Sequence, residues 1–181
     1  FQMWLQRKVP GKLATKLLPE EKGVALAKRI AQAIHKVHQA NIPTSRSHTM
    51  TEELRILHER LPLVGLIEPQ WTQRLETILV ACDRLGANTL EPHLRGIHRD
   101  FYPDQVITDG TSLYLLDFDL YCEGNPALDI GNFIAHIQEQ SLRTLGNIDA
   151  LKDRENALVE EFLKLSDKAT TIADISTYTI L

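Results

Sequence analysis

Residues 96–119 read GIHRDFYPDQVITDGTSLYLLDFD, and the interpretation of the whole chain starts from this stretch. Two short runs of β-forming residues, Val106–Thr108 and Leu113–Leu116, flank the sequence Asp109-Gly110-Thr111-Ser112. Asp-Gly between such runs is a strong signal of a β-hairpin, because glycine accepts the positive φ that a tight turn requires. The sequence therefore predicts one small hairpin at this position.

Acidic and amide side chains stand at the open end of this hairpin. Asp100 and Gln105 precede the first strand, and Asp117 follows the second. A tight hairpin returns the chain to its starting end, so Gln105 and Asp117 should be neighbours and Asp100 should lie near both. Carboxylate and amide oxygens are hard donors that suit Mg²⁺, which commonly takes one or two carboxylates together with substrate phosphates. The alternative is an ordinary polar turn between two packed segments.

Most of the remaining chain has helical periodicity, interrupted by proline, asparagine or glycine. The predicted fold class is therefore α+β and mostly helical. The expected helices are Glu21 to His38, Thr51 to about Arg60 with Pro62 ending it, a segment with Pro69 in its first turn that stops at Gly86, a segment that starts at the Asn125-Pro126 cap and buries Ile130, Phe133, Ile134 and Ile137, and about Asp149 to Ser166.

Composition and charge limit the class of protein. The chain has 181 residues, enough for one domain, and a net charge of -4 without a long run of either sign. Its basic cluster, LQRKVPGKLATK, is short and has no aromatic ladder, so no nucleic-acid partner is expected. No apolar stretch reaches the roughly 20 residues that span a bilayer, so no membrane association is expected. Only two cysteines, Cys82 and Cys122, are present, which favours a reduced, cytoplasmic setting.

The segments HRDFYPDQV and LLDFDLYCEGNPALDIGNF together resemble the signature of the aminoglycoside phosphotransferase and choline kinase-like enzymes, which have a protein-kinase-like fold. The matching elements occur in the family's order, with the hairpin between two of them. They are His98, Asp100, Gln105 at the position of an asparagine, Asp117-Phe118, Gly124-Asn125-Pro126 and Asp129. The resemblance implies the C-terminal lobe of this fold, in which the hairpin carries the catalytic and metal loops.

The resemblance also implies roles for individual residues. Asp100 would orient or deprotonate the acceptor hydroxyl. Asp117 would bind Mg²⁺ that bridges the phosphates of ATP or GTP, and Gln105 would offer an amide oxygen to the same or a second ion. His98 and Asp129 would brace the loop.

The opening of the chain, FQMWLQRKVPGKLATKLL, also resembles a family segment, the hinge between the two lobes. In this interpretation backbone groups near Met3, Trp4 and Leu5 would contact the adenine of the nucleotide.

Several of these residues also have purely structural explanations. Asp129 lies in the first turn of a helix, where the helix dipole alone favours a carboxylate. A histidine such as His98 is more often a hydrogen-bonded core residue than a catalyst, and Asp119 could face either solvent or metal. His35 and His38 have no nearby third ligand and are interpreted as surface or packing residues. The acids Glu155, Glu160 and Glu161 are interpreted as solvated positions, and Cys82 as a core residue.

The chain departs from the family pattern at two points. Gln105 replaces asparagine and moves the amide oxygen outward by about one methylene, although maltokinase-like members of the superfamily also place glutamine here. No GxGxxG or GxxxxGK motif occurs anywhere. We therefore interpret residues 1–18 as a hinge or linker from an N-terminal lobe expected upstream, and 19–181 as the helical C-terminal lobe. Catalysis by this fragment alone is then doubtful, because phosphoryl transfer depends on positioning and charge stabilisation.

The favoured hypothesis is an ATP-dependent phosphotransferase that moves the γ-phosphoryl group onto a hydroxyl of a small molecule of sugar, aminoglycoside or amino-alcohol type. The alternative is a non-catalytic kinase-like module that binds a nucleotide or a protein partner, which the substitution at Gln105 favours. A metal-dependent hydrolase that uses the same acids lacks the usual histidine-rich ligand set.

Overall fold

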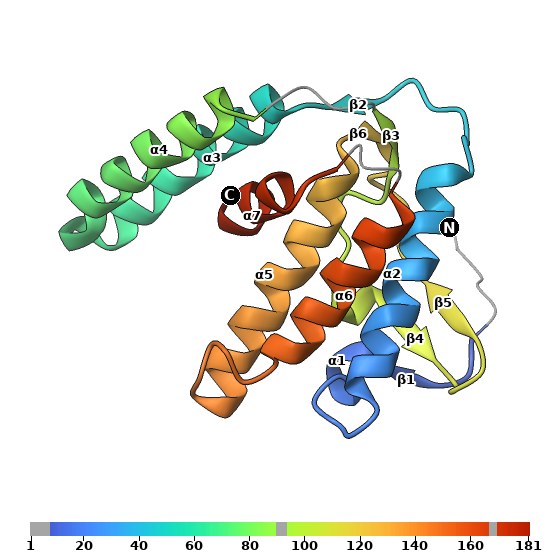
Figure 1. Ribbon diagram of the computed structural model, residues 1–181. Helices are drawn as coiled ribbons and strands as arrows, with labels where there is room; N and C mark the ends of the chain where they lie inside the picture. Colours follow the sequence, from blue (N-terminus) through green and yellow to red (C-terminus); the bar gives the residue numbers. More distant parts are fainter. Residues whose placement is uncertain (1–7, 90–93, 167–169) are drawn as a thin grey trace, which may run out of the picture.

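The computed structural model describes residues 8–89, 94–166 and 170–181, and helices dominate it (Figure 1). The predicted α+β, mostly helical class is confirmed. The helices are α1 (Ala14–Leu17), α2 (Gly23–Gln39), α3 (Met50–Ile67), α4 (Thr72–Ala87), α5 (Pro126–Leu145), α6 (Lys152–Leu165) and α7 (Ile172–Ile180), with two 3-10 turns at Pro69–Trp71 and Pro103–Gln105. The strands are β1 (Lys12–Leu13), β2 (Ser47–His48), β3 (Arg95–Ile97), β4 (Val106–Thr108), β5 (Leu113–Leu115) and β6 (Cys122–Gly124).

The predicted hairpin is present as β4 and β5, which pair antiparallel with Val106 opposite Leu115 and Thr108 opposite Leu113. The expectation of a single hairpin was incomplete, because β4 and β5 belong to a three-stranded sheet of order β1-β4-β5. A second three-stranded sheet has the order β2-β6-β3. Strands of two or three residues show no sequence periodicity, which explains why they were not predicted.

The two sheets are joined by a pair of loops that lie opposite each other. β3 and β6 pair antiparallel in one sheet, and β4 and β5 pair antiparallel in the other. The chain therefore leaves β3 through residues 98–105 to enter β4, and it leaves β5 through residues 116–121 to reach β6. Both predicted functional loops are thus held at each end by a strand.

The helical core forms below these loops. α2 packs along α6, and α7 packs across α5 (Figure 1). Ile30 and Ile34 of α2, Phe133 of α5 and Phe162 of α6 are all buried in one hydrophobic cluster. α7 approaches α5 closely at Gly131, where an added Cβ would lie 2.6 Å from the backbone of Tyr178. The sequence prediction missed α7, whose nine residues are too few for a clear periodic pattern.

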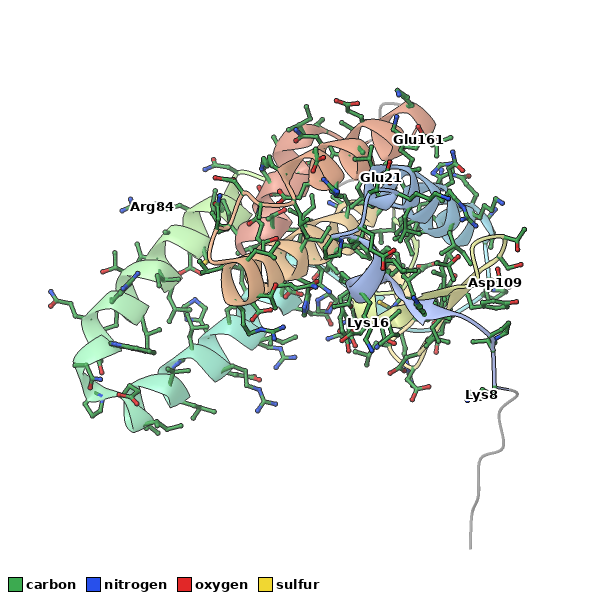
Figure 2. All side chains as sticks on the ribbon, turned by 90° about the horizontal axis from the view of Figure 1, so that it is seen from below. Lys8, Lys16, Glu21, Arg84, Asp109 and Glu161 are labelled. Carbon is green, nitrogen blue, oxygen red and sulfur yellow. The ribbon has the colours of Figure 1, made fainter. Side chains whose placement is uncertain are left out.

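The helix predicted to end at Pro62 continues to Ile67, so that boundary was wrong. A proline inside a helix costs one backbone hydrogen bond. Packing against α4 offsets that cost on both sides of Pro62: Leu54 of α3 lies against Gly86, and Gly65 lies against Thr72. Figure 2 shows the α3–α4 pair extending away from the other helices, with Arg84 on α4 and Asp109 on opposite sides of the molecule. Among the described residues, no helix has the length and apolar character needed to cross a membrane.

Candidate active site

The loop of residues 98–105 is anchored from below by an aromatic side chain. Phe101 is fully buried, and its ring lies 5.0 Å from that of Phe133 on α5. Asn132 of the same helix donates a hydrogen bond from Nδ2 to the carbonyl oxygen of Phe101 at 3.1 Å. The neighbouring Asp100 remains partly exposed. Burial of Phe101 therefore fixes the loop to α5 while Asp100 stays accessible.

Asp129 holds the start of this loop through its carboxylate. Asp129 is fully buried, and its Oδ2 and Oδ1 accept the backbone N–H groups of His98 at 2.9 Å and Arg99 at 2.8 Å. Arg99 has a φ of 73°, a strained conformation for a residue with a side chain, and these hydrogen bonds support it. Asp129 thus does more than complement a helix dipole, because it defines the backbone that leads into Asp100.

His38 also belongs to this arrangement, so its interpretation as a surface or packing residue missed a partner. The residue is 1% exposed, and its Nε2 donates to Oδ2 of Asp129 at 2.8 Å. The ring also lies edge-on to Phe162 at 5.7 Å. The imidazole supplies a third hydrogen bond to the buried carboxylate, which reduces the cost of burying that charge.

The second loop is linked to the first by two hydrogen bonds. The ring of His98 donates from Nε2 to the carbonyl oxygen of Leu116 at 2.7 Å, and the N–H of Leu116 donates to the carbonyl oxygen of Gln105 at 2.9 Å. The next residue, Asp117, has a φ of 57° and an exposed side chain. The backbones of Leu116 and Gln105 are hydrogen-bonded, so the backbone of Asp117, the next residue, lies close to Gln105 as expected.

The pKa of the Tyr102 hydroxyl responds to acidic side chains from both loops. Burial raises the pKa of its hydroxyl, and the negative charges of Asp100, Asp104 and Asp117 raise this pKa further. The ring of Tyr102 stacks on His136 of α5 with 4.6 Å between centroids. Sequence reasoning missed Tyr102, because its only signal was its place between two acids.

A cleft of about 280 Å³ opens beside Asp100. Its lining includes Arg99 of the Asp100 loop, Asn132 of α5, Glu53 of α3 and Tyr178 of α7. Glu53 is held in place by the ring of the buried His48, whose Nε2 contacts its Oε2. The cleft therefore brings acids from two distant parts of the chain together, in a volume suited to part of a small molecule.

Of the remaining predicted residues, the structure describes Asp119 and Asn125 but not the three expected near the adenine. Asp119 is exposed, and its carbonyl oxygen accepts a hydrogen bond from Nη1 of Arg46 at 2.6 Å. Asn125 caps α5 as predicted, because its Oδ1 accepts from the N–H of Ala127 at 2.9 Å. The predicted adenine contacts Met3, Trp4 and Leu5 lie outside the described residues.

The donors near Asp117 fit Mg²⁺ by their chemistry. Within residues 8–89, 94–166 and 170–181, no group of three or more His, Cys, Asp and Glu side chains is placed to hold a metal ion. Mg²⁺ does not need such a group, because it commonly takes one or two carboxylates and completes its shell with phosphates and water. Asp117, Gln105 and Asp100 offer hard oxygen donors of this kind, and their roles stay predictions.

Two facing loops at one end of a helical lobe define the kinase-like class of fold. The profile of the phosphotransferase enzyme family matches residues 1–157. The chain therefore belongs to the phosphotransferase enzyme family, and the sequence resemblance is confirmed. No curated protein sequence matches the chain.

Solved structures show the same fold at low sequence identity. An aminoglycoside-3'-phosphotransferase of type VIII superposes with a TM-score of 0.69 and 16% identity, over 96% of this chain and 65% of its own. A glucosamine kinase in complex with glucosamine, ADP and inorganic phosphate gives 0.68 and 12%, over 91% and 51%. An aminoglycoside phosphotransferase from Streptomyces rimosus in complex with ADP and streptomycin gives 0.66 and 16%, over 96% and 66%. The chain thus spans about half to two thirds of these structures.

Proposed function

We propose that this chain is the C-terminal lobe of an ATP- or GTP-dependent phosphotransferase that acts on a hydroxyl group of a small molecule. The observation that carries the proposal is the pair of hydrogen bonds that links the Asp100 loop to the Asp117 loop: His98 Nε2 donates to the carbonyl oxygen of Leu116, and the N–H of Leu116 donates to the carbonyl oxygen of Gln105. Membership of the phosphotransferase enzyme family supports it. The N-terminal lobe, with a phosphate-covering loop, is proposed to precede residues 1–18.

Asp100 is the residue proposed to act on the acceptor. Its carboxylate accepts the hydrogen bond of the acceptor hydroxyl, orients the oxygen toward the γ-phosphorus and takes the proton as transfer proceeds. The new bond joins the hydroxyl oxygen to the γ-phosphorus, while the bond to the β,γ-bridging oxygen breaks and the nucleoside diphosphate leaves. The position of Asp100 beside the 280 Å³ cleft supports this role.

Asp117 and Gln105 are the residues proposed to hold Mg²⁺, through a carboxylate and an amide oxygen. When bound, the ion neutralises the charge that develops on the phosphate oxygens. The contribution of the chain is to fix these donors: Leu116 ties the Asp117 loop to the Gln105 carbonyl, and His98 ties it to the Asp100 loop.

The acceptor is proposed to occupy the cleft between the Asp100 loop, α3 and α7. Glu53 and Asp100 supply hydrogen-bond acceptors, Arg99 supplies a cation, and Leu120 and Leu128 supply apolar walls. Such a mixed lining suits a polyhydroxylated molecule with or without an amino group. The related structures named for glucosamine and streptomycin belong to proteins that bind such molecules.

The test of the proposal is Mg²⁺-dependent formation of ADP from ATP by a chain that includes the upstream lobe, with a panel of sugars, aminoglycosides and amino alcohols. Asp100→Asn should lower kcat at least about 100-fold and leave ATP binding intact, because the base is lost and the metal site remains. Asp104→Asn is the matched control, since Asp104 is an exposed acid of the same loop bound to Thr15, and it should keep activity within about threefold. Equal losses in both variants would contradict the role of Asp100.

A second candidate is a kinase-like module that binds a nucleotide without turnover. The glutamine at position 105, where the resemblance expects asparagine, is the observation that favours it. Under this alternative the wild-type chain binds Mg·ATP but forms no ADP with any acceptor, and Gln105→Asn introduces activity. Under the favoured proposal the wild type is already active and Gln105→Asn changes the rate only mildly.

A further inference from the structure

A pocket of about 520 Å³ lies at the closed end of the β4–β5 hairpin, between the turn of the hairpin, β1, α1 and the start of α2. Its apolar wall is formed by Leu17 of α1 and by Ala25 and Leu26 of α2. Pockets that bind small molecules usually measure about 300–1,000 Å³ and combine apolar walls with a few polar groups. The volume and the apolar wall of this pocket therefore suit a small molecule.

The charged groups of this pocket are mainly cationic. Lys12, Lys22 and Arg29 line it, and Asp109 is the one acid among its described lining residues. The lining therefore carries three positive charges and one negative charge, although the chain as a whole has a net charge of -4. A local excess of positive charge on a chain of this kind favours an anionic ligand.

The positive charges of the pocket are not neutralised by ion pairs with described residues. The guanidinium of Arg29 donates to two uncharged acceptors, from Nη1 to the carbonyl oxygen of Gly110 at 2.8 Å and from Nη2 to that of Thr111 at 2.7 Å. These bonds fix the position of the guanidinium and leave its charge unbalanced. The described lysines and arginines that do form salt bridges are Arg55, Arg143, Lys152, Arg154 and Lys164. None of these lines the pocket.

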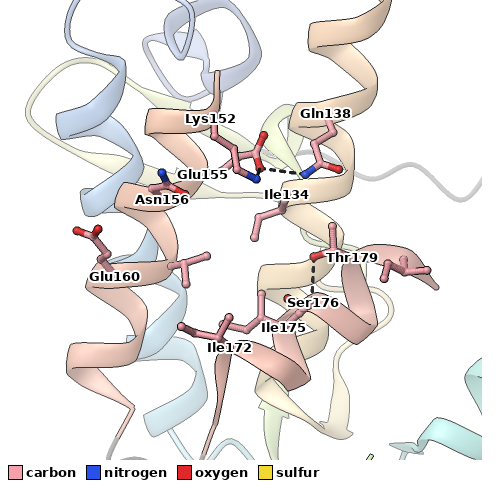
Figure 3. Close-up of a pocket in the computed structure, with 12 residues that line it drawn as sticks. Ile134, Gln138, Lys152, Glu155, Asn156, Glu160, Ile172, Ile175, Ser176 and Thr179 are labelled. Atoms are coloured by element: carbon pink, nitrogen blue, oxygen red, sulfur yellow. Dashed lines mark hydrogen bonds and ion pairs between the residues drawn. The ribbon is translucent and has the colours of Figure 1, made fainter. Parts of the chain in front are cut away.

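A second pocket, of about 480 Å³ between α5, α6 and α7, has a different charge balance (Figure 3). Its Lys152 donates from Nζ to Oε2 of Glu155 at 3.0 Å, so these two charges neutralise each other. Glu155 is only 2% exposed and also accepts from Nε2 of Gln138 at 2.9 Å, so its interpretation as a solvated acid was wrong. The cation of that pocket already has an anionic partner, whereas the cations at the hairpin turn have none among the described residues.

We propose that the pocket at the hairpin turn binds a small molecule with an apolar body and one anionic group, a carboxylate or a phosphate monoester. The anionic group binds the ammonium groups of Lys12 and Lys22, which are exposed and can approach it. The apolar body lies against Leu17 and Leu26, and Arg29 adds positive potential from a fixed position. An anion balances the charge of the lining, whereas an ammonium group would increase it.

This pocket and the proposed active site lie at opposite ends of the hairpin. Thr108, Asp109 and Gly110 line the pocket at the turn, whereas Gln105 and Asp117 flank the open end. The three residues of each strand place about 10 Å between the two ends. None of the residues proposed for phosphoryl transfer lines the pocket. The inference therefore goes beyond the proposed function, and it can hold or fail independently of any kinase activity.

The test uses NMR of leucine and alanine methyl groups in the chain that includes the upstream lobe. The probes are cyclohexylacetate, cyclohexylmethyl phosphate and cyclohexylmethylamine, which share a body and differ in the charged group. At least one of the two anions should shift the methyl signals of Leu17, Ala25 and Leu26 in a saturable way, and the tighter of them identifies the anionic group. The amine should bind at least about tenfold more weakly. No saturable shift with either anion at millimolar concentrations, or an amine that binds as tightly, would overturn the proposal.

A pair of alanine variants locates the binding. Ala25→Phe should fill the pocket and abolish the saturable shifts of Leu17 and Leu26, because Ala25 is an exposed lining residue whose replacement removes no core contact. Ala40→Phe is the matched control: it adds the same ring at an exposed position after the other end of α2, outside the lining, and should leave binding unchanged. Shifts that persist in Ala25→Phe while its spectrum remains that of a folded protein would contradict the assignment.

The double variant Lys12→Gln, Lys22→Gln tests the charge itself. Both lysines are exposed, so the fold should be retained, and the anionic probe should bind about tenfold more weakly because both of its ionic partners are lost. The matched control is Lys36→Gln, Lys164→Gln, which removes two exposed lysines outside the lining and changes the net charge by the same amount. The control should keep the affinity within about twofold. Equal losses in the two double variants would mean a general effect of net charge and would overturn the assignment to this pocket.

Discussion

Asp129 joins three donors that lie far apart in the sequence. Its oxygens accept from the backbone of His98 and Arg99, and from the ring of His38, which is 91 residues away. The hydrogen bonds from His98 and Arg99 fix the path of the backbone that leads into Asp100. The sequence offered two interpretations of Asp129, a residue that braces the loop and a carboxylate favoured by the helix dipole, but it could not identify these partners, because they are brought together only by folding.

Replacing this carboxylate by an amide should be costly. In Asp129→Asn the NH2 group would face an N–H donor, so we expect the free energy of unfolding to fall by about 3 kcal/mol. Urea denaturation followed by circular dichroism measures the change. Asp149→Asn, an exposed acid beyond the end of α5, is the matched control and should cost less than about 0.5 kcal/mol. If the free energy of unfolding of Asp129→Asn fell by less than about 1 kcal/mol, the hydrogen bonds to Asp129 would contribute little to stability.

The roles assigned to Asp100, Asp117 and Gln105 came from the motif, and the structure adds the contacts that fix their loops. His98 was expected to brace the loop, and its hydrogen bond to Leu116 is a contact of the kind that bracing needs. Tyr102 and Glu53 were not predicted, because each gains meaning only from residues brought near it by folding.

Among the elements, the β4–β5 hairpin depends on its turn. Asp109 Oδ1 accepts the N–H groups of Thr111 and Ser112, and these backbone hydrogen bonds lower the pKa of its carboxyl. Gly110 has a φ of +97°, and an added Cβ would meet nothing within 4 Å. The requirement for glycine is therefore conformational and not steric, as the Asp-Gly pattern predicts.

A test of this turn is Gly110→Ala. Because the cost comes from backbone strain alone, we expect the free energy of unfolding to fall by about 1–2 kcal/mol. Ser112→Ala keeps the backbone hydrogen bonds of the turn and should change it by less than about 0.5 kcal/mol. Chemical denaturation of the two variants side by side measures the difference. Equal stability of Gly110→Ala and the wild type would mean that the turn adopts another conformation.

The second element-scale feature is the proline inside α3. Local rules predicted a helix end at Pro62, and the paired helix α4 overrides them. Pro62 is exposed, so Pro62→Ala removes no buried contact and restores a missing backbone donor. We expect α3 to become more stable by about 1–3 kcal/mol, seen as slower amide hydrogen exchange on both sides of residue 62. Gln73→Ala, an exposed change on α4, is the control and should have little effect on amide exchange in α3. Faster amide exchange around residue 62 in Pro62→Ala would contradict the prediction.

At the scale of the whole molecule, the fold is organised by the two loops between its sheets. The elements of one motif, found in order within residues 98–129, predicted the kinase-like class, and the family match confirms the resemblance. The motif could do so because its residues define local turns, caps and strand pairs. The α3–α4 pair, α7 and the strands β2 and β3 lie outside the motif, and their positions depend on packing between distant segments.

We propose a site for Mg²⁺ and nucleotide at Asp117, Gln105 and Asp100. Thermal unfolding of a chain that includes the upstream lobe, with ATP in the presence and absence of Mg²⁺, tests it most directly. At an ATP concentration about 100 times the dissociation constant, binding stabilises the folded state by about 2.7 kcal/mol. That corresponds to a rise in Tm of roughly 5 °C or more.

The decisive comparison is between Asp117→Asn and Asp104→Asn. Asparagine tolerates the positive φ of residue 117, so this variant removes the charge without adding strain. The account predicts a Mg²⁺-dependent rise in Tm for the wild type and for Asp104→Asn, and no Mg²⁺-dependent rise for Asp117→Asn. A rise of equal size in Asp117→Asn, or a wild-type rise that does not depend on Mg²⁺, would contradict the proposed site.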